Sequence, residues 1–184
     1  MSIRTPFNPL GTLGAVYPYV QPVMKQGSSV LHGITDESYP YTFKMTLTGD
    51  ARSQESYAYA PFDTNPANYW GVYATGTRTR KLNMSFEKQL LINGMEMTYG
   101  LFTFYSGFYT VFKFYGLEDG EDPTTGGTLL GEFEIPSRDF TRLSFNNRRY
   151  YKEYRLDITA RGKGTDLPSW AQVKGITLDA YYKR

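Results

Sequence analysis

Hydrophobic and polar residues alternate in short stretches along most of the chain, and helical periodicity is nearly absent. Residues 41–48 (YTFKMTLT) alternate between apolar and polar positions, and residues 81–86 repeat the pattern. A two-residue period is typical of β-strands with one buried face. The residues that this pattern predicts to face the core are Phe43, Met45, Leu47, Leu82, Met84 and Phe86.

The predicted strands are short and follow one another at intervals of about ten residues, which is typical of a sandwich or a barrel. The best helical candidate, residues 85–91, is short and is soon followed by Asn93-Gly94, a turn dipeptide. We therefore interpret this region as strand, turn, strand. The predicted strands are residues 41–48, 57–60, 81–86, 91–99, 110–117, 129–135, 140–145, 154–159 and 175–182.

Residues 1–29 differ from the rest of the chain because they show no alternation and hold four of its ten prolines. This composition predicts an extended N-terminal arm, followed by a β-sandwich domain over residues 30–184. A mobile tail is the alternative. Tyr17 and Tyr19 favour an arm that docks on its own domain or on a neighbouring molecule.

The composition agrees with β-structure and limits the kinds of catalytic and metal sites that the chain can form. The chain has 184 residues, of which 40% are hydrophobic and 17% aromatic, with 18 glycines and 10 prolines. It has no cysteine, and its single histidine, His32, leaves little for a catalytic triad or a histidine zinc site. A net charge of +2 gives no argument for nucleic acid. The sequence therefore predicts a protein that is not an enzyme.

The chain shows neither a membrane-spanning segment nor a secretory signal. Its apolar runs fall far below the roughly 20 residues that a spanning helix needs. The first 20 residues lack a continuous apolar core and are interrupted by prolines. We expect no membrane partner and no export by a signal peptide.

The order of motifs over residues 57–182 resembles the galactose-binding-like family, the discoidin-type jelly roll found in many carbohydrate-binding modules. The resemblance is a pattern of aromatic and aliphatic positions rather than a fingerprint. It begins with an Asp-containing loop that runs into a Trp and ends with two long strands. The motifs are FDTN (62–65) followed by Tyr69-Trp70, LNMSF (82–86), LINGMEM (91–97), FKFYG (112–116), and the closing strands 151–158 and 173–182.

The resemblance implies an all-β jelly-roll sandwich whose ligand loops gather at one end. Aromatic side chains there would stack on sugar rings, and polar side chains would bind hydroxyl groups. The alternative for Trp70 and Trp170 is packing in the core or at its rim. The candidate ligand-binding residues are Asn65, Tyr69, Trp70, Tyr105, Arg161 and Trp170.

Members of this family often hold a structural calcium ion, for which Asp63 is the candidate ligand. The last strand carries Gly175 or Leu178 where the family has an acidic residue. Because calcium sites need several converging oxygen ligands, the sequence predicts no cofactor and leaves Asp63 as an isolated candidate.

Residues 99–109 (YGLFTFYSGFY) are the most aromatic stretch, with six Phe or Tyr in eleven positions. Such a stretch favours a contact with a partner subunit, with core packing and glycan binding as alternatives. The candidate interface residues are Tyr17, Tyr19, Phe102, Phe104, Tyr105, Phe108 and Tyr109.

Charge is divided between two blocks, which are candidates for contacts between copies. Residues 118–134 carry a balance of −6, and residues 138–163 carry a balance of +5. Head-to-tail contact between copies would pair the two blocks, and two solvated loops are the alternative.

Two functional hypotheses follow. The first is a structural or assembly component of a phage-like particle, such as a tail, baseplate or decoration protein, built on a galactose-binding-like sandwich. It would be located in the virion after assembly in the host cytoplasm, form homo-oligomers, contact other virion subunits and contact host surface glycans. The second is a stand-alone, lectin-like carbohydrate-binding module.

Overall fold

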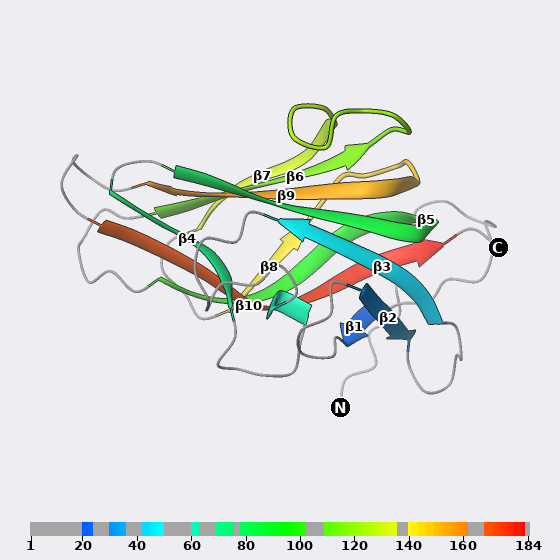
Figure 1. Ribbon diagram of the computed structural model, residues 1–184, viewed down its shortest axis with the longest axis horizontal. Coiled ribbons are helices and arrows are strands. Elements are labelled where there is room, and N and C mark those ends of the chain that lie inside the picture. Colours follow the sequence, from blue (N-terminus) through cyan, green and yellow to red (C-terminus); the bar gives the residue numbers. More distant parts are fainter. Residues whose placement is uncertain are drawn as a thin grey trace.

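The protein is built almost entirely from antiparallel β-strands (Figure 1). The structure, a computed structural model, describes residues 20–23, 30–35, 42–49, 60–62, 69–75, 78–101, 109–135, 140–161 and 168–182. The one helical element in these ranges is the short 3-10 turn η1, Ala60–Phe62. The predicted all-β fold is confirmed.

The ten strands of the described residues form one continuous antiparallel sheet that folds into two layers. The strands are β1 (Val20–Val23), β2 (Val30–Thr35), β3 (Thr42–Gly49), β4 (Trp70–Thr75), β5 (Arg78–Leu101), β6 (Tyr109–Leu117), β7 (Thr128–Ile135), β8 (Phe140–Ser144), β9 (Tyr151–Arg161) and β10 (Pro168–Tyr182).

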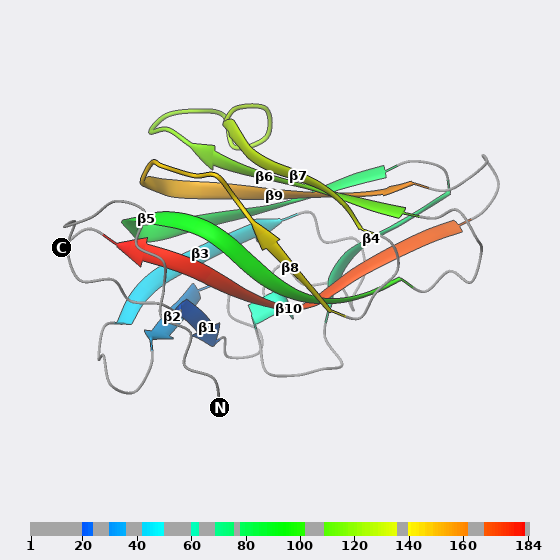
Figure 2. The ribbon, with the colours of Figure 1, turned by 180° about the vertical axis from the view of Figure 1, so that it is seen from behind.

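Strand β5 belongs to both layers because its two halves pair with different strands. Residues 78–85 pair with β9, which continues to β6 and β7 in the upper layer of Figure 1. Residues 90–101 pair with β10 in the lower layer. Figure 2 shows from behind how β8 lies along this second half, on the other side from β10. The sandwich is therefore two sheets that share one bent strand.

The continuity of β5 corrects the predicted turn at Asn93-Gly94. The register with β9 shifts between Ser85 and Leu90, and Gly94 lies inside the strand, opposite Asp179 of β10. A Cβ atom on Gly94 would lie 2.8 Å from the Asp179 carboxylate and 2.8 Å from the Leu143 carbonyl oxygen. The glycine permits this close approach of β8 and β10, so the dipeptide marks tight packing rather than a turn.

Most of the other predicted strands are present, with longer bounds for several of them. Residues 41–48, 110–117, 129–135, 140–145, 154–159 and 175–182 correspond to β3 and to β6 through β10. The alternation pattern missed β1, β2 and β4, which are short. The predicted strand at residues 57–60 lies outside the described residues except for Ala60, which belongs to η1.

Part of the predicted arm is a strand of the sheet. Within residues 1–29, β1 pairs with β2 along its whole length, from Val20 opposite Thr35 to Val23 opposite His32. Val20 also lies opposite Leu178 of β10. Residues 1–19 and 24–29 lie outside the described residues.

The core contains a cluster of aromatic rings centred on Tyr154 of β9. Its ring stacks on Phe114 at a centroid distance of 5.3 Å and meets Phe86 edge-on at 6.0 Å. The prediction that Leu82, Met84 and Phe86 face inward is confirmed, since all three are buried. Large stacked rings of this kind supply much of the buried apolar area of a small domain.

The Tyr154 hydroxyl joins the two layers across this core. It donates a hydrogen bond to the Leu90 carbonyl oxygen at 2.5 Å and accepts one from the Ile92 backbone N–H at 3.3 Å. Both backbone groups belong to the part of β5 just beyond its register shift. Burial raises the pKa of the Tyr154 hydroxyl, which therefore stays protonated as a hydrogen-bond donor.

We expect Tyr154→Phe to lower the free energy of unfolding by about 1–3 kcal/mol, because the Leu90 carbonyl and the Ile92 N–H lose a buried partner. Urea denaturation measures this change. Tyr150→Phe makes the same chemical change at a half-buried residue in the neighbouring loop, and we expect it to cost less than about 0.5 kcal/mol. Equal effects of the two substitutions would contradict the role of the Tyr154 hydroxyl.

Candidate functional site

Six strand ends meet at one end of the sandwich, on the left of Figure 1, and we call this the strand-end region. Tyr109 lies opposite Arg161, Arg78 lies opposite Ala160, and Pro168 lies opposite Thr75. Leu101 lies opposite Ala171, three residues into β10. The connections 76–77, 102–108 and 162–167 therefore start and finish at this end, although they lie outside the described residues.

Two of the predicted ligand-binding residues belong to strands at the strand-end region. Arg161 is the last residue of β9, and Trp170 is the third residue of β10, opposite Tyr73 of β4. Tyr105, within the connection 102–108, lies outside the described residues. The strands that flank these segments end at the strand-end region, and the predicted ligand-binding role of the three residues stays a prediction.

Tyr69 and Trp70 occupy a different place. Trp70 is 0% exposed and belongs to the hydrophobic core, and Tyr69 is 9% exposed. Trp70 begins β4 opposite Val173, five residues along β10 from Pro168, so it lies well away from the strand-end region. A ring without exposed surface cannot stack on a sugar, and Trp70 follows the packing alternative.

The remaining predicted positions lie mostly outside the described residues. These are Asp63, Asn65, Tyr17, Tyr19, Phe102, Phe104 and Phe108. Tyr109 is the first residue of β6. Within the described ranges, no group of three or more His, Asp or Glu side chains is arranged to hold a metal ion. The same ranges contain no helix that is long and apolar enough to span a membrane.

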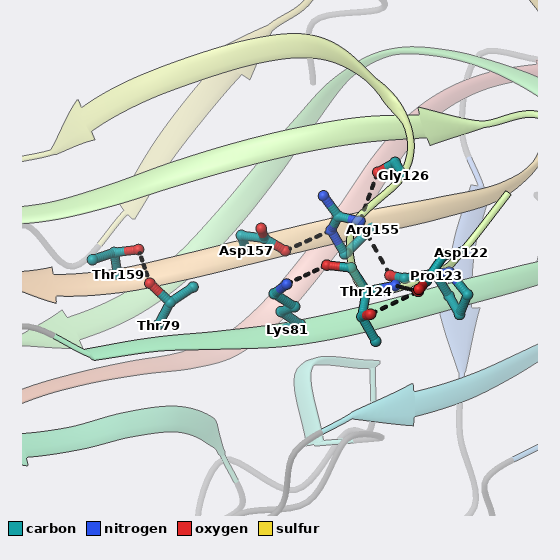
Figure 3. A network of polar contacts seen from close by, with 9 residues as sticks. All are labelled: Thr79, Lys81, Asp122, Pro123, Thr124, Gly126, Arg155, Asp157 and Thr159. Atoms are coloured by element: carbon teal, nitrogen blue, oxygen red, sulfur yellow. Dashed lines mark hydrogen bonds and ion pairs between the residues drawn. The ribbon is translucent and has the colours of Figure 1, made fainter.

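A polar network that the sequence pattern did not predict lies on the outer face of β5, β9 and β6, which we call the polar face (Figure 3). Arg155 and Asp157 of β9 form an ion pair, with 2.8 Å between Nε and Oδ1. The Arg155 side chain is only 4% exposed, and its guanidinium group lies 4.2 Å from the centre of the Tyr115 ring. Two charged residues at positions i and i+2 of a strand share one face, and this spacing was the available signal.

The acidic loop at residues 118–127 folds over the polar face. Arg155 donates hydrogen bonds from Nη1 to the carbonyl oxygens of Pro123 at 3.1 Å and Gly126 at 2.7 Å. Lys81 of β5 donates to the carbonyl oxygen of Thr124 (Figure 3). The loop is thus tied to the sheet through its main chain.

Hydrogen bonds within the loop also stabilise its conformation. One oxygen of Asp122 accepts hydrogen bonds from the Thr124 backbone N–H and from the Thr124 hydroxyl, both at 2.6 Å. These bonds hold the pKa of the Asp122 carboxyl below its usual value. Gly120 and Gly127 have φ angles of 86° and 104°, which favour glycine at these turns. The loop therefore has a defined conformation.

The two charge blocks predicted to join separate copies meet within one chain. Arg149 of the basic block lies 3.5 Å from Glu118 of the acidic block, and Lys113, which belongs to neither block, lies 3.1 Å from Glu132. Exposed ion pairs of this kind contribute little stability, about 0–1 kcal/mol each. Complementary charge within the chain weakens the argument for head-to-tail contact.

No protein-family model matches the sequence, and no curated protein sequence matches it. Solved structures do match. A family 32 carbohydrate-binding module from C. perfringens NanJ, in complex with galactose, has a TM-score of 0.52 and 17% identity, and the match covers 73% of this chain and 92% of that one.

Two further solved structures match the chain to a similar extent. A Clostridium perfringens module in complex with GalNAc-β-1,3-galactose has a TM-score of 0.51 and 15% identity over 74% of this chain and 94% of that one. An F5/8 type C domain from Bacteroides fragilis has a TM-score of 0.52 and 12% identity over 76% of this chain and 93% of that one. The chain therefore has the galactose-binding-like jelly-roll fold.

Some matching structures belong to enzymes. In a Ruminococcus gnavus GH29 fucosidase in complex with fucose, the match has a TM-score of 0.51 and 13% identity, and it covers 77% of this chain but 25% of the fucosidase chain. A domain of this fold thus occurs within a larger catalytic protein.

Burial of Asp157 predicts a pH dependence of stability. Burial raises the pKa of the Asp157 carboxyl above 3.8, against the opposing effects of Arg155, Lys81 and Lys113. A carboxyl with a raised pKa in the folded state contributes stability below its unfolded pKa, and this contribution is lost as pH rises through the folded pKa.

We therefore expect wild type to lose stability relative to Asp157→Asn as the pH rises from about 3.8. Urea denaturation of both proteins across this range measures the difference. Asp119→Asn, at an exposed carboxyl of the loop, serves as the control. If the stability of wild type instead increases relative to that of Asp157→Asn as the pH rises, the ion pair with Arg155 outweighs the effect of burial.

Proposed function

We propose that this chain is a non-catalytic, lectin-like module that binds carbohydrate at the strand-end region. The observation that carries the proposal is the match to modules of the same fold whose structures hold galactose or GalNAc-β-1,3-galactose. The match covers more than nine-tenths of each of these modules. The proposed ligand class is therefore a glycan that contains galactose or a related sugar.

The residue types at the strand-end region suit this ligand. Arg161 supplies charge-assisted hydrogen bonds to hydroxyl groups, and Trp170 and Tyr105 supply aromatic rings that stack on the C–H face of a sugar. Trp70 and Tyr69 are left out of the proposed site because both are buried. Asn65 stays a sequence-based candidate.

The assembly hypothesis ranks second. None of the matching structures described above is a particle protein, and the described part of the arm pairs with the sheet of its own chain. The charge blocks also pair in part within the chain. The virion location, the homo-oligomer and the contacts with virion subunits therefore stay predictions from the sequence.

A glycan array probed with the purified protein tests the proposal. We expect binding to galactose-containing glycans, with equal signal in calcium and in chelator because the sequence predicts no calcium site. Trp170→Ala and Arg161→Ala should each weaken binding about tenfold or more through the loss of a stacking or charge-assisted contact. A blank array in both conditions would contradict the proposal and favour the assembly hypothesis.

Two control variants separate binding from folding. Lys152→Ala removes an exposed basic residue from the same strand as Arg161, at its far end, and should leave binding unchanged. Trp70→Ala should lower the free energy of unfolding by about 3–5 kcal/mol, as expected for a fully buried aromatic residue. An equally large loss of stability in Trp170→Ala would assign Trp170 to packing as well.

A further inference from the structure

The polar face contains a hollow that is separate from the strand-end region. Its volume is about 200 Å³, and it lies where β3, β5, β9 and β6 run side by side beneath the loop at residues 118–127. Its lining residues are Thr48, Asn83, Met84, Ser85, Leu117, Pro123, Glu153 and Tyr154.

The strand register explains why these side chains converge. Thr48 lies opposite Asn83, and Ser85 lies opposite Glu153, which in turn lies opposite Leu117. Directly opposed residues of antiparallel strands point to the same face. The side chains of Met84 and Tyr154 point the other way into the core, so these two residues offer mainly their backbone.

The hollow combines polar groups with apolar surface. Two hydroxyls, one carboxamide and one carboxylate come from Thr48, Ser85, Asn83 and Glu153, and Leu117 and Pro123 add apolar surface. Hydroxyl groups on a pyranose ring need such donors and acceptors, and the ring's C–H groups need an apolar contact. Small-molecule sites for larger ligands usually exceed about 300 Å³, so this hollow suits a single sugar ring.

Asn83 has an unsatisfied group at this place. Its Oδ1 atom is buried and accepts no hydrogen bond from the residues that the structure describes. The nearest cationic neighbour across the strand, Arg155, directs its guanidinium group to Asp157 and to the carbonyl oxygens of Pro123 and Gly126. A rotation of the Asn83 side chain toward the hollow would bring Oδ1 within reach of a ligand hydroxyl, whose hydrogen bond would remove the cost of leaving this oxygen unpaired.

The surrounding charge selects against an anionic ligand. Glu153 lines the hollow, and the loop beside it carries Glu118, Asp119, Glu121 and Asp122. Of the cations that contact the loop, Lys81 and Arg155 bind its carbonyl oxygens and Arg149 pairs with Glu118. A sugar carboxylate would therefore meet carboxylates rather than free cations.

We propose that the hollow is a second carbohydrate site, which binds one uncharged pyranose ring through Asn83, Ser85 and Glu153. The site does not require sugar binding at the strand-end region, so each proposal can be tested independently of the other. A module with both sites would hold two sugar residues, or two chains, at once.

An NMR titration of the full chain with methyl galactoside, methyl glucoside and glucuronate tests this site. We expect the two uncharged sugars to shift the amide resonances of Asn83, Ser85, Leu117 and Glu153. Asn83→Ala should weaken this binding about tenfold, which corresponds to the loss of one buried hydrogen bond. Ser85→Ala provides a second test should Asn83→Ala fail to fold.

Two controls locate the effect. Thr79→Ala changes a residue of the same strand and face outside the hollow, and should leave the shifts and the affinity unchanged. Trp170→Ala should also leave them unchanged while it weakens binding at the strand-end region. Shifts confined to the strand-end region would overturn the second site and leave the first intact. Binding of glucuronate as tight as that of the methyl glycosides, or full affinity in Asn83→Ala or Ser85→Ala, would also overturn it.

Discussion

The structure depends on one bent strand that is shared by two sheets. Each half of β5 is hydrogen-bonded to different neighbours, and between the halves its register with β9 is interrupted. The Tyr154 hydroxyl binds the backbone just beyond this interruption from the opposite layer. The stacked rings of Phe114 and Phe145, at 4.7 Å, extend the same contact through the core. These contacts thus hold the two layers together beside the register shift of β5.

The sequence predicted the fold well where one face of a strand is buried and the other faces solvent. Leu82, Met84 and Phe86 follow that rule, and the alternation located β5 and its inward face. Asn93-Gly94 was misread because its glycine serves the close approach of neighbouring strands, which no local pattern reveals. Strands β1, β2 and β4 were not predicted from the sequence, and their pairing with other strands of the sheet defines them.

The candidate sites were harder to predict than the fold. The resemblance proposed Trp70 and Trp170 alike as ligand-binding residues, and the sequence could not reveal that the core buries Trp70 completely. The polar face escaped notice because Arg155 and Asp157 look like ordinary surface charges in the sequence. Their importance arises from the loop that folds over them, a contact between positions about 30 residues apart. Asn83 acquires its place in the hollow in the same way, through neighbours on three other strands.

The way in which the loop at residues 118–127 is attached has an evolutionary consequence. Arg155 and Lys81 bind its carbonyl oxygens, which every amino acid possesses, whereas few of its own side chains take part in the attachment. The loop's own conformation depends on Asp122, Thr124, Glu121 and the glycines at 120, 126 and 127, whereas its other positions contribute no side chain to these anchors. The remaining exposed positions of the loop can therefore change in sequence while its attachment to the sheet is kept.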